Sequence, residues 1–319
     1  MKKQKRPTIT GIIDLLAIGL AIATVFGFLG RLHWFLDLFS HFRVQYMQLC
    51  LPLIGLALWK QMTRRAGALV ILAAINYALV LPFYFGKPDP ATEKPIRAML
   101  MNINAGNGNT KHVLEAIQQA KPDLLLLEEV TPKWVTELKV LKQDYKYRIV
   151  EPREDCFGIM LLSKVPLEHR DIIEIGAASV PSIVAEAHFP QGVVSIIGTH
   201  PLPPAGADYS NHRNNQLAAL PALVKKQNYP VLLIGDLNTT PWSSHFQTME
   251  KESGLKNSMK GFGFQPSWRG NAFLKIPIDH ILHAPEIKIH NRMIGGDVGS
   301  DHYPVIVDFS IRQSGNAKN

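Results

Sequence analysis

Long apolar runs dominate the first 87 residues of the chain. Residues 8–30 contain one charged side chain, Asp14, and residues 44–59 and 66–86 contain none. A helix of about 20 apolar residues crosses the roughly 30 Å hydrocarbon core of a bilayer. The pattern therefore predicts three transmembrane helices, over residues 8–30, 44–59 and 66–86. Buried helices of a soluble domain are the alternative, and three nearly charge-free runs in succession argue against it.

The basic residues of the connecting segments predict how these helices are oriented, because Lys and Arg are retained on the cytoplasmic side. The loop 31–43 is rich in aromatic residues, as expected of an interfacial turn on the opposite face. Three crossings then place everything after residue 87 on the extracytoplasmic side. The basic residues before the first run and between the second and third are Lys2, Lys3, Lys5, Arg6, Lys60, Arg64 and Arg65.

A short proline-rich linker follows the apolar region. Residues 88–95 contain three prolines, which exclude both a regular helix and a central strand. We therefore divide the chain into a membrane anchor (1–87), a linker (88–95), a globular domain (96–311) and a polar tail (312–319).

Within the globular domain, short apolar runs alternate with stretches of helical spacing. This alternation predicts an α/β fold of two or three layers, or a stack of two such halves. The predicted strands are 97–103, 124–127, 157–162, 183–189, 193–199, one from 231, one ending at 282, and 305–309. The predicted helices are 111–120, one from 131, 208–226 and 243–252.

One strand-to-helix loop is central to this domain. Residues 231–234 are consecutive apolar residues between a proline and a glycine, which predicts a buried strand. The Thr-Pro pair at 240–241 predicts the start of a helix. Asp236 and Asn238 therefore lie where α/β enzymes place reacting polar groups, beyond the carboxyl end of a buried strand. An Asx-turn with a helix cap is the alternative for this loop taken alone.

Other polar side chains stand at predicted strand ends in the same way. If these side chains lie together at one edge of the sheet, they form a site made of carboxylates, amides and imidazoles. The chain has only two cysteines, Cys50 and Cys156, so oxygen ligands dominate and Mg²⁺ or Mn²⁺ is favoured over zinc. The residues of this constellation are Asn102, Glu129, His200, Asp236, Asn238, Asp279, Asp301 and His302.

The positive net charge of the chain is confined to its first 87 residues. The net charge of +8 would suit a protein that binds nucleic acid. Residues 1–87, however, hold 10 Lys and Arg against two acids, and the rest of the chain holds 24 of each. The globular domain is therefore neutral, and no overall field draws it to a polyanion.

Residues 96–311 resemble the endonuclease/exonuclease/phosphatase superfamily, whose members include deoxyribonuclease I and neutral sphingomyelinases. The resemblance is carried by MNIN, LEEV, GTHPLPP, GDLN and the pair IDH and SDHYPV, in this order. It implies a four-layer α/β/β/α sandwich of two packed mixed sheets. Three preceding membrane helices resemble a bacterial membrane-anchored branch of the family, which implies a multi-pass protein of the inner membrane.

The resemblance also implies roles for individual residues. Glu129 would be the main ligand of a Mg²⁺ or Mn²⁺ ion, with Asn102 beside it and Asp301 completing the site. His302 would contact the scissile phosphate, and Asp279 would hold its ring. The remaining catalytic positions are Asp236, which would activate the water, Asn238 on a phosphate oxygen, and His200 on the phosphate or leaving group.

Two residues depart from the family pattern. Glu128 stands where the family usually has Gln, and Asn104 stands where several relatives have Asp. The first adds a negative charge near the metal and the second removes one. Asn104, Arg213 and Trp268 are also our candidates for contact with the substrate.

We expect a metal-dependent phosphoester hydrolase and, more narrowly, a phosphodiesterase that uses in-line attack by water. The alternatives are an extracytoplasmic nuclease and a non-catalytic membrane-anchored binding protein with the same fold. No obligate protein partner is evident. The neutral domain and its tether favour a lipid over a nucleic acid, and aromatic residues near the mouth suit either substrate. These aromatic residues are Trp242, Phe262, Phe264 and Trp268.

Overall fold

The computed structural model describes residues 8–86, 90–91 and 94–312. The basic residues before position 8, parts of the predicted linker and residues 313–319 of the tail lie outside the described residues. The chain forms two compact units. The first comprises Met1–Pro82 with Trp242–Ser244, and the second comprises Phe83–Pro241 with His245–Asn319.

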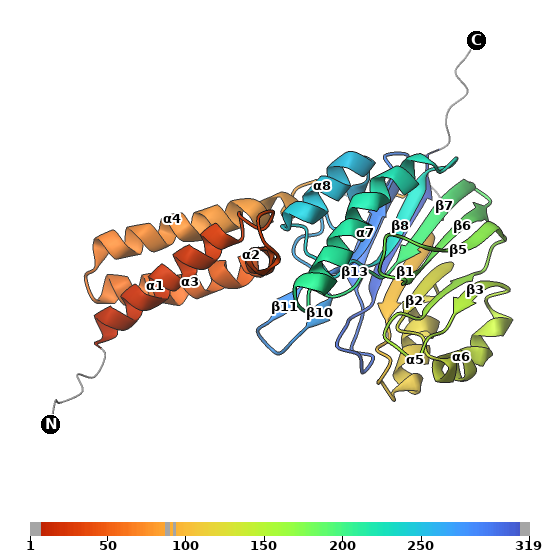
Figure 1. The fold of residues 1–319 in the computed structure, drawn as a ribbon, viewed down its shortest axis with the longest axis horizontal. Coiled ribbons are helices and arrows are strands. Elements are labelled where there is room, and N and C mark those ends of the chain that lie inside the picture. Colours follow the sequence, from red (N-terminus) through yellow and green to blue (C-terminus); the bar gives the residue numbers. More distant parts are fainter. Residues whose placement is uncertain (1–7, 87–89, 92–93, 313–319) are drawn as a thin grey trace, which may run out of the picture. The chain divides into compact units, whose positions relative to one another are not determined.

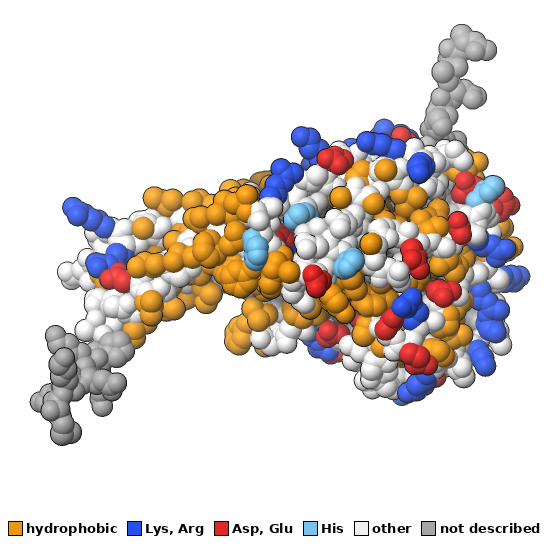
Figure 2. All heavy atoms as spheres, viewed as in Figure 1, with side chains coloured by type: hydrophobic (Ala, Val, Ile, Leu, Met, Phe, Trp, Pro, Cys, Tyr) orange, Lys and Arg blue, Asp and Glu red, His pale blue; other side chains and the backbone are white. Residues whose placement is uncertain are grey.

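The first unit is helical, and apolar side chains cover much of its outer surface (Figures 1 and 2). Two helices are long and apolar enough to cross a membrane, Ile9–Phe26 and Thr63–Tyr84, whereas three were predicted. The helix between them falls short because it has 17 residues and contains Pro52 and buried polar side chains such as Gln45. Soluble core helices and signal sequences share these properties, so the two helices alone do not establish a membrane anchor. The helices are α1 (Ile9–Phe26), α2 (Trp34–Leu38), η1 (Phe39–Phe42), α3 (Arg43–Trp59) and α4 (Thr63–Val80), continued by η2 (Leu81–Tyr84).

An ion pair joins the beginnings of α1 and α4. The Arg65 guanidinium donates from Nη2 to Asp14 Oδ2 over 2.9 Å. Asp14 is thus paired with Arg65 within the helical unit. The pair also shows that the N-terminal parts of α1 and α4 lie at the same end of this unit.

A polar network lies inside the same unit. Arg43 is buried and donates to the Thr24 carbonyl over 2.9 Å, while the Asn76 amide donates to the Thr24 hydroxyl over 2.9 Å. Gly27 leaves room for the guanidinium, because a Cβ at this position would lie 2.5 Å from Arg43 Nη2. Burial of a charge is tolerated where hydrogen bonds satisfy it, so these bonds fix α1, α3 and α4 against one another.

The second unit contains two six-stranded mixed sheets. The first sheet has the order β13-β14-β1-β2-β4-β3, and its β1–β2 pair is parallel while its other pairs are antiparallel. Its strands are β1 (Ile96–Asn102), β2 (Leu124–Glu128), β3 (Tyr147–Glu151), β4 (Ile159–Ser163), β13 (Ile287–Ile294) and β14 (Val305–Ile311).

The second sheet has the order β5-β6-β7-β8-β12-β9 and likewise one parallel pair, β7–β8. A separate hairpin of β10 (Trp268–Arg269) and β11 (Lys275–Ile276) lies between β9 and β12 in the sequence. The strands are β5 (Leu167–Glu174), β6 (Pro181–Phe189), β7 (Gly192–Thr199), β8 (Val231–Asp236), β9 (Lys256–Asn257) and β12 (Asp279–His283).

Three apolar clusters define the layers. The central cluster joins the inner faces of the sheets through residues such as Leu126 and Ile234. A second packs the first sheet against α5 (Thr110–Ala120) and α6 (Pro132–Glu137), which continues as η3 (Leu138–Gln143). A third packs the second sheet against α7 (Ala207–Lys225) and α8 (Ser244–Ser253). The result is the α/β/β/α arrangement visible in Figure 1, as the sequence predicts.

Two details differ from the predicted elements. The structure adds β3, β5, β9 and β13, which are the outermost strands of the two sheets. Their outer position leaves them partly exposed, so they lack the continuous apolar runs of the central strands. The second difference is the helix predicted from Thr240, because Pro241 and Trp242 form a turn and α8 begins at Ser244. Trp242 is buried rather than lining a mouth, and its indole N–H donates to the Leu79 carbonyl.

Candidate active site

Three loops at strand ends contain a residue with left-handed backbone geometry. Asn104 follows β1 with a φ of 59°, Glu129 follows β2 with 60°, and Asn238 follows β8 with 49°. A side chain makes this conformation costly, so such residues concentrate where function requires a particular chain direction. Because β1 and β2 are parallel neighbours, their loops meet at one edge of the first sheet.

Glu129 is held with both carboxylate oxygens facing donors. Asn102 donates from Nδ2 to Oε1 over 3.0 Å, and the Ala105 backbone N–H donates to Oε2 over 2.9 Å. Asn102 in turn accepts the Asn104 backbone N–H at Oδ1 over 3.1 Å. Each carboxylate oxygen keeps a further lone pair for a cation. Asn102 therefore orients Glu129, the residue predicted as the main metal ligand.

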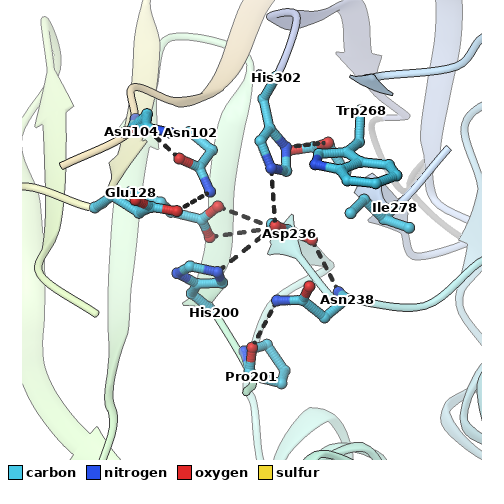
Figure 3. A network of polar contacts seen from close by, with 12 residues as sticks. Asn102, Asn104, Glu128, His200, Pro201, Asp236, Asn238, Trp268, Ile278 and His302 are labelled. Carbon is cyan, nitrogen blue, oxygen red and sulfur yellow. Dashed lines mark hydrogen bonds and ion pairs between the residues drawn. The ribbon is translucent and has the colours of Figure 1, made fainter. Parts of the chain in front are cut away.

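Asp301 is also fixed on both oxygens. It accepts a hydrogen bond from Asn104 Nδ2 over 2.8 Å and one from Trp268 Nε1 over 3.0 Å. Burial opposes ionisation of this half-buried carboxyl, but these bonds and the charge of His302 outweigh it and lower its pKa. Asn104 and Trp268, predicted to contact substrate, thus both donate a hydrogen bond to Asp301. Figure 3 shows where these two side chains lie around Asp236.

Asp236 lies between two imidazoles. Its Oδ2 atom is 3.6 Å from Nε2 of His200 and 3.6 Å from Nε2 of His302 (Figure 3). Its Oδ1 atom accepts the Asn238 backbone N–H over 2.9 Å, which turns the carboxylate toward the rings. Asp236, His200 and His302 are all at least 95% buried. The predicted water-activating carboxylate and both predicted histidines therefore share one enclosed site.

His302 is bound at its other nitrogen by a second carboxylate. Asp279 accepts from Nδ1 over 2.9 Å, so this nitrogen carries the proton and Nε2 faces Asp236. Burial disfavours the imidazolium, but the charges of Asp279 and Asp236 prevail and raise the His302 pKa to about 10. Burial likewise opposes ionisation of Asp279, and the His302 charge reverses this and lowers its pKa.

His200 has a nitrogen for which the described residues offer no hydrogen-bond partner. Its Nδ1 atom is buried without one, while its ring packs against Phe157 at 5.4 Å between centroids. Burial opposes protonation, but Asp236 and the charge of Glu128 raise the His200 pKa to about 9. A buried donor or acceptor left unpaired costs free energy, so this atom is suited to contact a bound group.

The loop that carries Asn238 is supported from beneath by Arg213. The Asn238 side chain donates from Nδ2 to the Pro201 carbonyl over 2.9 Å and keeps a second N–H (Figure 3). Arg213 is fully buried and donates from Nη1 to the Asn238 carbonyl over 3.0 Å. Arg213, predicted to contact the substrate, is therefore buried against the backbone of the Asn238 loop.

Glu128 acquires a position that the sequence did not predict. It is fully buried at the end of β2 and accepts the Asp236 backbone N–H, at 3.0 Å from Oε2, so it joins the two sheets directly beneath the site. Burial is the main reason that its pKa rises to about 8, and the charge of His200 partly offsets it. Gly235 makes the approach possible, since a Cβ there would lie 1.8 Å from the Thr199 carbonyl and 3.0 Å from Glu128 Oε1.

We expect Glu128→Gln to retain catalytic activity within about threefold, because the amide oxygen can accept the same N–H. Glu128→Ala should lower the free energy of unfolding by about 1–3 kcal/mol, because it leaves the buried Asp236 N–H unpaired. Urea unfolding and initial rates on the two variants test this. Equal stability of the alanine and glutamine variants would contradict the bridging role.

The donor set fits a divalent cation. Among the described residues, Asp236, Asp279 and His302 can each offer a ligand atom, with these atoms all within 4.8 Å of one another. Glu129, the ligand that the sequence predicts, is not in this group. We regard Glu129 as the better ligand, because Asp279 and His302 are hydrogen-bonded to each other and a His302 Nε2 that keeps a proton cannot bind metal. Hard oxygen donors of either set suit Mg²⁺ or Mn²⁺.

The chain belongs to the endonuclease/exonuclease/phosphatase family, whose sequence model matches residues 99–302. The match spans the predicted motifs from β1 to His302 and confirms the superfamily predicted from them. The protein is therefore a phosphoesterase of a family of metal-dependent hydrolases, and the predicted enzyme class is confirmed. No curated protein matches the chain significantly.

Solved structures show the same fold at low sequence identity. The human Nocturnin catalytic domain with bound sulfate is 19% identical, with a TM-score of 0.59, over 72% of this chain and 98% of that one. A D. rerio TDP2 complexed with single-strand DNA product is 16% identical, with a TM-score of 0.59, over 68% and 100%. An endonuclease/exonuclease/phosphatase from Beutenbergia cavernae is 18% identical, with a TM-score of 0.57, over 69% and 72%.

Proposed function

We propose that this protein is a membrane-anchored, divalent-metal-dependent phosphodiesterase that uses in-line attack of water. The observation that carries the proposal is the buried Asp236 carboxylate, 3.6 Å from the Nε2 atoms of both His200 and His302. A carboxylate flanked by two proton-bearing rings can hold a water on one side and phosphate oxygens on the other. We assign the catalytic domain to residues 96–311, behind the linker 88–95.

Glu129 is the proposed ligand of the cation, oriented by Asn102. The ion, Mg²⁺ or Mn²⁺, would supply positive charge to the non-bridging phosphate oxygens. Asp301, fixed by Asn104 and Trp268, completes the anionic side of the site and holds these two residues beside the substrate. Asn104 and Trp268 thereby hold Asp301 from two different segments of the chain.

The remaining residues divide the steps of hydrolysis among themselves. Asp236 accepts a proton from the attacking water. His302, oriented by Asp279, donates from Nε2 to the phosphate, and His200 stabilises the phosphate or the leaving oxygen. Asn238 offers its second N–H to a phosphate oxygen, while Arg213 acts as a positioning residue for the Asn238 loop.

Three observations support membrane anchoring by α1, α3 and α4 as three crossings. Two of these helices have the length and hydropathy of membrane spans. The Asp14–Arg65 pair joins the N-terminal parts of α1 and α4, which is the geometry that an intervening crossing by α3 produces. Lys60 precedes α4, and Arg64 and Arg65 lie in its first turn, so the positive-inside rule favours a cytoplasmic start for both α1 and α4. Residues after 87 then lie outside the cytoplasm, in the arrangement of a bacterial inner-membrane protein.

The proposed substrate is a phospholipid or another membrane-associated phosphodiester. The globular part carries balanced charge, so release of counterions contributes little to DNA binding. The tether keeps the site near a bilayer, where lipid is the abundant phosphodiester. The D. rerio TDP2 complex with single-strand DNA product favours an extracytoplasmic nuclease as the second candidate, because the fold is shared.

One preparation of the full chain separates the two candidates. Initial rates with Mg²⁺ or Mn²⁺ should be measured on phospholipid and sphingomyelin vesicles, on single-stranded oligonucleotides and on plasmid DNA at moderate salt. We expect the lipid to be cleaved at least as well as either DNA. Efficient cleavage of DNA without turnover of lipid would favour the nuclease. A His302→Gln variant in every assay controls for a contaminating hydrolase.

A further inference from the structure

A basic pocket lies in the second unit away from the catalytic residues. It has a volume of about 270 Å³. Among the described residues that line it, four carry full positive charge and none is acidic. The four are Lys256, Lys260, Lys288 and Arg312. Such a concentration of one sign attracts a small anion, and the volume approaches that of a small-molecule site, about 300 Å³ and upward.

The positive charges come together because the ends of the two sheets meet. Lys256 lies on β9 of the second sheet and is the direct cross-strand partner of His283 on β12. Lys288 lies on β13 of the first sheet, and Arg312 follows β14 and donates its backbone N–H to the Glu286 carbonyl over 2.8 Å. The sheet thus sets Lys256 opposite an imidazole rather than a carboxylate.

The described residues that line the pocket keep a positive balance of charge. Burial lowers the pKa of His283, and the charge of Lys256 lowers it further. Two carboxylates lie close by in the described chain. Glu250 interacts with the charge of Lys260 and accepts the Asn257 backbone N–H over 3.1 Å, and Glu286 is exposed to solvent. An anion bound among the lysines would relieve their mutual repulsion.

The pocket is also close along the chain to the end of an apolar helix. Gly86, which lines the pocket, is two residues beyond Tyr84, where the apolar helix Thr63–Tyr84 ends. Two extended residues span at most about 7 Å. The Phe83 carbonyl accepts the backbone N–H groups of Gly261 and Gly263 over 2.9 and 2.8 Å. These hydrogen bonds hold the end of the apolar helix against the segment that follows Lys260.

We propose that this pocket binds the phosphate headgroup of an anionic phospholipid in the membrane that anchors the chain. The anionic chemistry follows from the four basic side chains, and the lipid source follows from the two-residue separation between Gly86 and the apolar helix. Clustered Lys and Arg side chains close to a bilayer attract anionic headgroups electrostatically. The lipid source rests on the proposed membrane anchoring, whereas the site itself is independent of the proposed catalysis.

The pocket is distinct from the active site. His283 lines the pocket and Asp279 binds His302, and these residues are the two ends of β12. Four residue steps along a strand separate them by about 13 Å. Lipid at this pocket would therefore give the catalytic unit a second attachment to the bilayer, in addition to the covalent linker.

The test uses the full chain in uncharged detergent with a chelator present to prevent turnover. Three probes are titrated at about 0.15 M salt, where distant surface charges are screened. They are dioctanoyl phosphatidylglycerol, dioctanoyl phosphatidylcholine and inorganic phosphate. We expect phosphatidylglycerol to bind at least about tenfold more tightly than either of the others. Equal affinity for the two lipids would overturn the proposal, and phosphate binding as tightly as phosphatidylglycerol would overturn the lipid source.

Two charge-reversed variants localise the binding. Lys256→Glu with Lys288→Glu should weaken phosphatidylglycerol binding at least about tenfold. Lys225→Glu with Lys226→Glu makes the same change in net charge at the exposed end of α7 and should leave binding intact. Equal effects of the two pairs would overturn the proposed location. His302→Gln should bind lipid normally, which separates this site from the catalytic proposal, and carbonate extraction of the full chain tests anchoring separately.

Discussion

His302→Gln should lower kcat by about a thousandfold while the protein still binds Mn²⁺ with nearly normal affinity. The Nδ1 atom of His302 is committed to Asp279, so Nε2 alone faces the site. This atom can donate to a phosphate or ligate a metal, but it cannot do both. Loss of a positioned donor to the developing charge accounts for a rate effect of about 10² to 10⁴.

Glu129→Gln should show the opposite separation. It should weaken Mn²⁺ binding at least about tenfold, because it removes the ligand that Asn102 and Ala105 orient. Calorimetric titration with Mn²⁺ and initial rates at saturating metal distinguish the two variants. His290→Gln and Glu115→Gln, outside the site, provide matched controls. Reduced Mn²⁺ affinity in His302→Gln with normal affinity in Glu129→Gln would assign the metal to the Asp236, Asp279 and His302 group instead.

A reporter fusion at residue 87 should give an all-or-none result. Alkaline phosphatase fused there should be active, and green fluorescent protein fused there should be dark, because three crossings place this point outside the cytoplasm. If α1 and α4 cross but α3 does not, the point returns to the side of the N-terminus. The basic residues before α4 would then lie outside, against the positive-inside rule. Bright green fluorescence with silent phosphatase would establish that arrangement.

Fusion of the same two reporters at residue 60 gives the internal control. This point precedes α4 and follows α3, so a three-crossing anchor predicts the reverse pattern of reporter activity from that at residue 87. The same pattern at both positions would mean that α4 does not cross. The pair of fusion sites thus tests α4 separately from α1 and α3.

The sequence predicted the central strands because burial on both faces leaves a continuous apolar run. β2 is an example, since all of its residues are buried and its predicted and observed starts coincide at Leu124. The outer strands escaped prediction because one or both faces meet solvent. β5 has five consecutive exposed residues, so neither alternation nor an apolar run marks it.

The site was predicted as a set of residue types but not as a network. Polar residues at strand ends are visible in sequence, and the parallel pairs β1–β2 and β7–β8 explain why their loops converge. The partners that hold them come from distant loops. Trp268 bonds Asp301 from a hairpin, and Arg213 supports Asn238 from α7. No local pattern signals such contacts, because they depend on how helices and hairpins pack over the sheets.

The role of Glu128 is a second case that no local sequence pattern signals. In sequence it is a second acid beside Glu129, and it was interpreted as extra charge near the metal. Alternation along a strand directs neighbouring side chains to opposite faces, and Glu128 points between the sheets to the Asp236 backbone. Its role therefore depends on the packing of two sheets whose contact the sequence does not specify directly.

Hydrolysis of bis(4-nitrophenyl) phosphate by the purified full chain tests the central claim most directly. The account predicts turnover with Mg²⁺ or Mn²⁺, loss of turnover on chelation and its recovery when the metal is restored. It also predicts turnover about a thousandfold lower in His302→Gln preparations of equal folded content. Absence of hydrolysis by the folded wild-type protein with every divalent cation, on this diester and on lipid and DNA substrates, would contradict it.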